Sequence, residues 1–172
     1  LNLDIMNLIF LSAGLVFSNS VKHFIRLLGN AAKVTGPFLV QYPLYAGLMG
    51  IMAVSGLGQI VVEFFVSFAT VETLPFWAFL SAGILNLFIP SGGGQWAVQG
   101  PIIVDAAISL GADIPRIAMA VAFGDTWTNT IQPFFAVPVL AIAGLTVRDI
   151  MGYGVVLLLY LGVVFGGALL LF

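Results

Sequence analysis

LPFWAFLSAGILNLFI-PSGGGQW-AVQGPIIVDAAISL, residues 74–110, places two apolar arms on either side of a glycine-rich tip, residues 90–96. The arms are about 16 and 14 residues long, whereas a full membrane span takes about 20 residues. The tip is embedded too deeply in apolar sequence to be an ordinary surface loop. Such backbone is tolerated at membrane depth only where it lines protein or a wet cavity. The pattern therefore predicts a re-entrant hairpin.

The composition of the whole chain places this hairpin in a membrane protein. Of 172 residues, 61% are hydrophobic and only 7% are charged, whereas a soluble domain carries about 25% charged residues. The apolar runs lack alternation, which favours helices over strands. The chain has no cysteine and one histidine. Disulfides, thiolate metal sites, cysteine nucleophiles and histidine-rich metal sites are therefore excluded.

Four further apolar segments complete the predicted architecture. Residues 3–18, 35–54 and 152–171 are expected to cross the bilayer, and residues 117–145 are expected to form one broken crossing. The fold class is therefore an all-α polytopic membrane helix bundle of four spans, one of them broken, plus the hairpin. We expect one transmembrane transport domain over residues 1–172. Many transporters are built from two inverted halves, so this domain is expected to be the C-terminal half of a longer one.

Charge predicts the orientation of the bundle. The amphipathic segment 19–33 carries Lys22, Arg26 and Lys33, three of the five basic residues. Short loops rich in Lys and Arg face the cytoplasm, so this interfacial segment is expected inside and the C-terminus outside. Residues 56–72 are expected to form a helix that lies along the outer surface.

The hairpin tip is the first candidate site. Glycine lets backbone turn tightly and leaves its N–H groups accessible. A helix that begins just after the tip would point its positive dipole end at a ligand there. These features suit a carboxylate, and a tight turn with no ligand is the alternative. The candidate substrate-binding residues at the tip are Ser91, Gly92, Gly93, Gly94 and Gln95.

The second candidate site is the polar break over residues 124–132. Asp125 is an ionisable residue inside the membrane, which makes it a functional candidate by default. It could bind a coupling cation, carry a coupling proton, or cap the helix break. The other candidate substrate ligands are Thr126, Thr128, Asn129 and Gln132, and the candidate cavity walls are Trp96, Trp127 and Phe134. Asn86, on the first arm, is expected to form an interhelical hydrogen bond.

A broken helix that faces a re-entrant tip is a recurring transporter arrangement. We therefore predict the substrate-binding half of a secondary transporter for small carboxylates, with Na⁺ or H⁺ balancing the anion and no other cofactor. An ion channel is one alternative, because glycine-rich tips also form ion filters. A structural membrane subunit is another. An intramembrane aspartyl protease would need a second aspartate beside Asp125, and Asp105 is the only candidate.

Four motifs resemble the bacterial short-chain fatty acid transporter family, and the resemblance covers essentially the whole chain. They are FIPSGGGQWAVQGP (88–101), GDTWTNTIQPF (124–134), VQYPLYAGLMGI (40–51) and LAIAGLTVRDIMGY (140–153). The resemblance implies an inverted-repeat transporter that takes up acids such as acetoacetate or butyrate across the bacterial inner membrane. It implies three partners: the carboxylate, the lipid bilayer and an N-terminal half. No nucleic-acid partner is expected, and homo-oligomerisation is left open.

Overall fold

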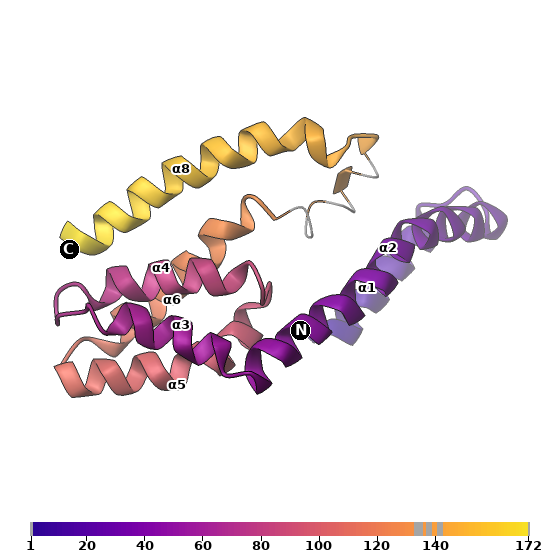
Figure 1. Ribbon diagram of the computed structural model, residues 1–172. Coiled ribbons are helices and arrows are strands. Elements are labelled where there is room, and N and C mark those ends of the chain that lie inside the picture. Colours follow the sequence, from indigo (N-terminus) through magenta and orange to yellow (C-terminus); the bar gives the residue numbers. More distant parts are fainter. Residues whose placement is uncertain (1, 133–135, 137–138, 141–142, 172) are drawn as a thin grey trace. The chain divides into compact units, whose positions relative to one another are not determined.

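The fold is taken from a computed structural model that describes residues 2–132, 136, 139–140 and 143–171, with side chains omitted at 34, 37 and 38. Every regular element in these residues is a helix, which confirms the all-α class (Figure 1). The helices with described bounds are α1 (Leu3–Val16), α2 (Val21–Val54), α3 (Leu57–Val66), α4 (Leu74–Asn86), α5 (Gly92–Leu110), α6 (Ile114–Asn129) and α8 (Val147–Leu171).

The chain divides into two compact units, Leu1–Val40 and Gln41–Phe172. In the first, Asn2 caps α1 by accepting a hydrogen bond from the Ile5 N–H, and the Phe24 ring lies 3.2 Å from where a Cβ on Gly14 would be. The expected single transport domain over residues 1–172 stays a prediction. Residues 21–33 of the expected interfacial segment form the first part of α2, which continues to Val54, and the position of this segment at the membrane surface stays a prediction.

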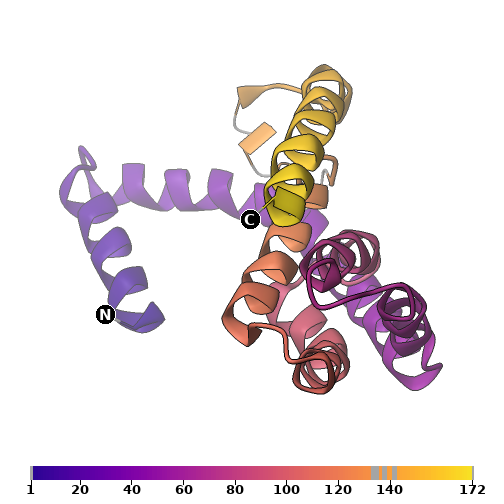
Figure 2. The same cartoon turned by 90° about the vertical axis from the view of Figure 1, so that its left-hand side faces the viewer.

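The second unit is built around α4 and α5, the two arms of the predicted hairpin. Residues 87–91 connect them, and α3, α4, α5 and α6 run side by side in both views (Figures 1 and 2). Pro75 stands in the first turn of α4, and Gly111, at φ +74°, ends α5. The 13 residues of α4 reach about 20 Å. This is short of the bilayer core of about 30 Å, so re-entry remains the prediction for this pair.

One described helix is both long enough and apolar enough to cross a membrane. That helix is α8, with 25 residues and a mean hydropathy of 2.5, and it contains the predicted span 152–171. A second crossing is counted if Leu39–Val54 and Leu57–Val66, which meet at a 61° bend, are taken together. The predicted total of four spans and the inverted repeat therefore stay predictions.

The predicted break at Gly124 is wrong. Helix α6 continues through Gly124 and ends at Asn129, with Thr130 as its C-cap. The physical reason is close packing, since a Cβ on Gly124 would collide with the Phe79 carbonyl oxygen and lie 2.6 Å from the Ala82 Cβ. Gly124 lets α6 approach α4, and the chain leaves the helix only after Asn129.

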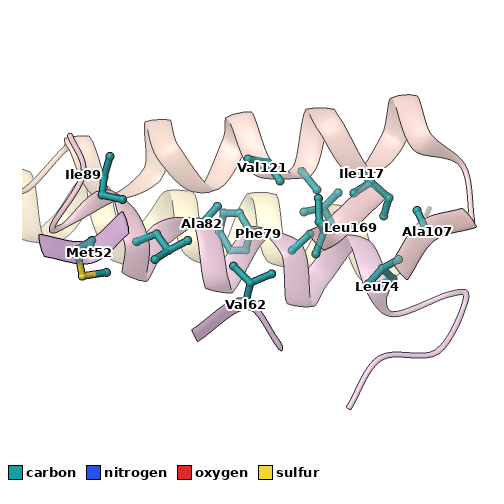
Figure 3. Packing of buried hydrophobic residues seen from close by; sticks show 14 residues of the cluster. Met52, Val62, Leu74, Phe79, Ala82, Ile89, Ala107, Ile117, Val121 and Leu169 are labelled. Carbon is teal, nitrogen blue, oxygen red and sulfur yellow. The ribbon is translucent and has the colours of Figure 1, made fainter. Parts of the chain in front are cut away.

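Buried side chains from five helices fill the space around α4. Phe79 and Ala82 of α4 and Val121 and Ile117 of α6 belong to one buried cluster (Figure 3). The remaining buried members include Met52, Val62, Ala107 and Leu169. This core holds the ends of α4, the start of α5 and the last turns of α6 in one place, where the candidate residues meet.

Candidate functional site

Helix α5 begins at the hairpin tip with unused hydrogen-bond donors. Ser91 has extended backbone and is the N-cap. Its Oγ accepts from the Gly94 N–H at 3.3 Å, and its carbonyl accepts from the Gln95 N–H at 2.7 Å. The first N–H groups of a helix have no acceptor within it. Among the described residues, the amides of Gly92 and Gly93 have no acceptor at all, and both glycines are exposed.

The Asp125 carboxylate of α6 lies beside this helix start. Its Oδ2 is 3.7 Å from where a Cβ on Gly92 would be. The same oxygen is 3.4 Å from the Asn129 Nδ2, which donates to it across one helical turn. Oδ1 is buried and has no partner in the described part of the chain. The two predicted sites therefore meet, with the acidic group against the positive end of α5.

Asn86 joins α4 to the end of α6. Its Nδ2 lies 2.8 Å from the Asp125 carbonyl oxygen, 2.9 Å from the Thr128 Oγ1 and 2.8 Å from the Asn129 Oδ1. An amide nitrogen has two hydrogens, so it shares them among three acceptors. Asn86 itself is fully buried. The expected interhelical hydrogen bond of Asn86 is confirmed.

Two of the predicted ligands bond to α4. Thr128 is buried, and its hydroxyl donates to the Gly83 carbonyl at 2.9 Å. Gln132 is also buried, and its Nε2 donates to the Asn86 carbonyl. Thr126, in contrast, is exposed. The donors of Thr128 and Gln132 thus hold α6 on α4, and substrate contacts by these three residues stay predictions.

A pair of buried glutamines joins the two hairpin arms. The Gln95 Nε2 donates to the Ala82 carbonyl at 3.0 Å and to the Gln99 Oε1 at 3.2 Å. The Gln99 Nε2 donates to the Ala78 carbonyl at 3.1 Å and to the Ser81 Oγ at 2.8 Å. Sequence reasoning missed Gln99. The signal was present, because two glutamines four residues apart share one face of an apolar helix.

Two cavities lie on either side of Gly92. The first, of about 280 Å³, is lined by Gly92, Gln95, Trp96, Ala118, Val121, Ala122 and Asp125. The second, of about 370 Å³, is lined by Tyr42, Tyr45, Ala46, Met49, Pro90, Ser91 and Gly92. The tip therefore presents polar backbone between two largely apolar chambers. The α2 side chains of the second chamber had not been predicted.

The two tryptophans occupy different surroundings. Trp96 lines the first cavity and is 38% exposed. Trp127 packs between α4 and α8: its ring stacks on Phe79 with centroids 4.8 Å apart, and its Nε1 donates to the Leu158 carbonyl at 2.7 Å. It lines neither cavity at the tip. Phe134, the third predicted wall, lies outside the described residues.

Within residues 2–132, 136, 139–140 and 143–171, no group of three or more His, Asp or Glu residues comes together. Asp105, the partner that a protease would need, is exposed on α5. The polar groups at the tip are instead two backbone amides, one carboxylate and several side-chain amides.

Comparison with known proteins matches the whole chain to one family. The profile of the family described as "Short chain fatty acid transporter" matches residues 1–172. A protein of Escherichia coli (strain K12) is 45% identical over 172 residues, which are 100% of this chain and 39% of that protein. One of Haemophilus influenzae (strain ATCC 51907 / DSM 11121 / KW20 / Rd) is 44% identical over 165 residues, 96% of this chain and 37% of that protein.

Both relatives bear the name "Putative short-chain fatty acid transporter". The chain spans less than two fifths of the length of either. No solved structure matches it.

Proposed function

The chain belongs to the short-chain fatty acid transporter family, and we propose that it supplies the carboxylate-binding part of a secondary transporter. The substrates are short-chain acids such as acetoacetate or butyrate, which cross the bacterial inner membrane by alternating access. The observation that carries the proposal is the pair of acceptor-free amides at Gly92 and Gly93. They stand at the start of a 19-residue helix between two cavities.

The tip suits a carboxylate for electrostatic reasons. A helix N-terminus combines free N–H donors with a partial positive charge, which together favour an anion. The neighbouring chambers suit a short acyl tail, because Trp96 and Val121 line one of them and Met49 lines the other. Ser91 fixes the helix start through its bond to Gly94. Gln95 sets the distance between the hairpin arms through Ala82.

Binding of a carboxylate at the tip requires that a positive charge neutralise Asp125. If its carboxylate were ionised about 5 Å from a bound anion, the repulsion would be about 3 kcal/mol at an effective dielectric constant of about 20. A proton or a cation on Asp125 removes this repulsion. Substrate binding and neutralisation of Asp125 would then favour each other, which is the condition for symport.

Uptake of labelled butyrate into vesicles tests the proposal. Gly93→Leu places a side chain where nothing lies within 4 Å of the new Cβ, so the fold should accommodate it, and we expect the side chain to hinder the approach of an anion to the amides. Uptake is expected to fall about tenfold or more, because hydrogen bonds to a charged group are each worth about 1.5–3 kcal/mol.

The matched control is Gly152→Leu on α8, where a Cβ also meets nothing within 4 Å. Its uptake should equal that of the parent. Equal uptake by both variants would place the carboxylate elsewhere. A channel would instead give ion currents that do not depend on butyrate.

A further inference from the structure

Several buried oxygen atoms around the hairpin lack a hydrogen-bond donor. Within the described residues, the buried side-chain atoms without a partner are Gln41 Oε1, Asn86 Oδ1, Gln95 Oε1, Asp125 Oδ1 and Gln132 Oε1. All five are acceptors. Four of them belong to the hairpin or to the segment from Asp125 to Gln132. Burying such atoms without a hydrogen-bond partner costs free energy. A ligand that accepts lone pairs, such as a cation, would remove this cost.

The orientations of the amides are set by their nitrogens. The Asn86 Nδ2 faces three acceptors, and the Gln95 Nε2 faces the Ala82 carbonyl and the Gln99 Oε1. Exchanging nitrogen and oxygen in either amide would put oxygen against oxygen. The unpartnered atoms of Asn86 and Gln95 are therefore oxygens. Both side chains are fully buried.

Two of the oxygens belong to residues that line one cavity. Gln95 and Asp125 line the same 280 Å³ cavity beside Gly92. The Asn86 amide nitrogen is 2.8 Å from the Asp125 carbonyl oxygen, but Asn86 does not line this cavity and is left out of the set. Gln132 lines a different cavity, together with Asn129, Ile150 and Met151, and is left out of the set.

We propose that a Na⁺ ion binds between the hairpin and α6, with Asp125 Oδ1 and Gln95 Oε1 as side-chain ligands. Hard cations take carboxylate and amide oxygens, and these two side chains provide one carboxylate and one neutral amide. A single carboxylate balances a single positive charge. A divalent ion would leave a net charge in surroundings of low dielectric, which is unfavourable.

This site deepens the proposed function and rests on it for its role in transport. Na⁺ on Asp125 would cancel the negative charge beside the Gly92 and Gly93 amides, so that the substrate carboxylate could occupy them. Gln95 would then bind the cation through Oε1 and join the two hairpin arms through the hydrogen bond from Nε2 to Ala82. Binding of the ion itself does not require that a substrate be transported.

Ion binding is measured on the complete protein that contains this chain, purified in detergent without substrate. Trp96 lines the same cavity as Asp125 and Gln95, so tryptophan emission is followed while NaCl replaces choline chloride at constant ionic strength. We expect a saturable change with Na⁺. An equal change with K⁺, or no saturable change, overturns the proposal.

Two matched pairs of variants locate the site. Asp125→Asn should abolish the Na⁺ response, whereas Asp105→Asn, which removes an exposed carboxylate from α5, should retain it. Gln95→Met should weaken Na⁺ affinity about 10- to 100-fold. Gln99→Met also removes bonds between the arms, those to Ala78 and Ser81, but it removes no unpartnered oxygen, so its affinity should change less. Equal losses in the two glutamine variants would show that hairpin packing, not ligation, is responsible.

Vesicle uptake separates this inference from the proposed function. Butyrate uptake that a proton gradient drives without Na⁺, together with no Na⁺ binding, overturns the ion site and leaves the transport function standing. Saturable Na⁺ binding without any carboxylate uptake supports the ion site and overturns the transport function.

Discussion

The tip of the hairpin and the end of α6 look alike in sequence and differ in structure. Both are short polar stretches within apolar helices, and each has a tryptophan beside it. At the tip, two exposed backbone amides have no acceptor among the described residues. At the end of α6, Asn86 and Gly83 of α4 engage the side chains of Thr128 and Asn129. The first region has hydrogen-bond donors available to a ligand. In the second, most of the polar groups are used in hydrogen bonds that hold helices together.

The difference shows that polar residues inside a membrane protein have two distinct uses. A polar group that bonds to a neighbouring helix stabilises packing, and removing it should lower stability. A polar group that is left unbonded at a cavity is available to a ligand, and removing it should lower binding. Variants in the two regions should therefore separate stability from transport.

The largest expected effect is at Gly124, in the region that holds the helices together. Gly124→Ala would push a methyl group into the Phe79 carbonyl and the Ala82 side chain, and overpacking of this kind costs up to about 3 kcal/mol. The free energy of unfolding, measured in detergent, should fall by about that amount. Gly152→Ala meets nothing within 4 Å and should be neutral. Equal stability of the two variants would remove the packing explanation for Gly124.

A smaller loss is expected at Asn86. Asn86→Leu keeps the volume but removes the donor that faces Asp125, Thr128 and Asn129. Leaving buried acceptors without a donor costs about 1–3 kcal/mol. Thermal unfolding should show this loss, whereas Asn30→Leu, at an exposed position of α2, should not. A stable Asn86→Leu variant would mean that the Asn86 side-chain bonds contribute little to holding α6 on α4.

The hairpin could be predicted because its signals are local. Two apolar arms around PSGGGQW indicate a turn and a helix start, and Ser91 and Gly92 occupy those positions. The structure around Gly124 could not be predicted correctly from local sequence. Glycine is needed there because the Phe79 backbone, 45 positions away in the chain, packs against it. Local sequence cannot tell a glycine that ends a helix from one that lets two helices touch.

The residues of the candidate site also differ in whether local sequence or tertiary packing determines their place. Asp125 and the tip residues were predicted to face each other as in other transporters, whereas the particular contact at Gly92 depends on how α6 packs against the hairpin. The α2 wall at Tyr42, Tyr45 and Met49 also depends on tertiary packing. Gln99 could have been predicted, because its spacing from Gln95 places both on one helix face.

The smallest expected effect distinguishes the two tryptophans. Trp127→Phe removes the N–H that donates to the Leu158 carbonyl and part of the ring that stacks on Phe79. A hydrogen bond between membrane helices is worth about 0.6 kcal/mol on average, so stability should fall by at least that amount, with the KM for butyrate unchanged. Trp96→Phe trims a cavity wall that is 38% exposed. It should leave stability unchanged and raise KM about threefold, which corresponds to a loss of about 0.7 kcal/mol in binding.

These two tryptophan variants are the sharpest comparison of the two regions, because the chemical change is the same in both. If Trp127→Phe raised KM and Trp96→Phe lowered stability, the assignments of the two regions would have to be exchanged. If both variants changed stability alone, the cavity beside Asp125 would not hold the acyl tail, and the chamber lined by Met49 and Pro90 would be the remaining candidate. A change in KM confined to Trp96→Phe would place the tail in the chamber that also contains the proposed Na⁺ ligands, so that one cavity serves both the anion and its counter-ion.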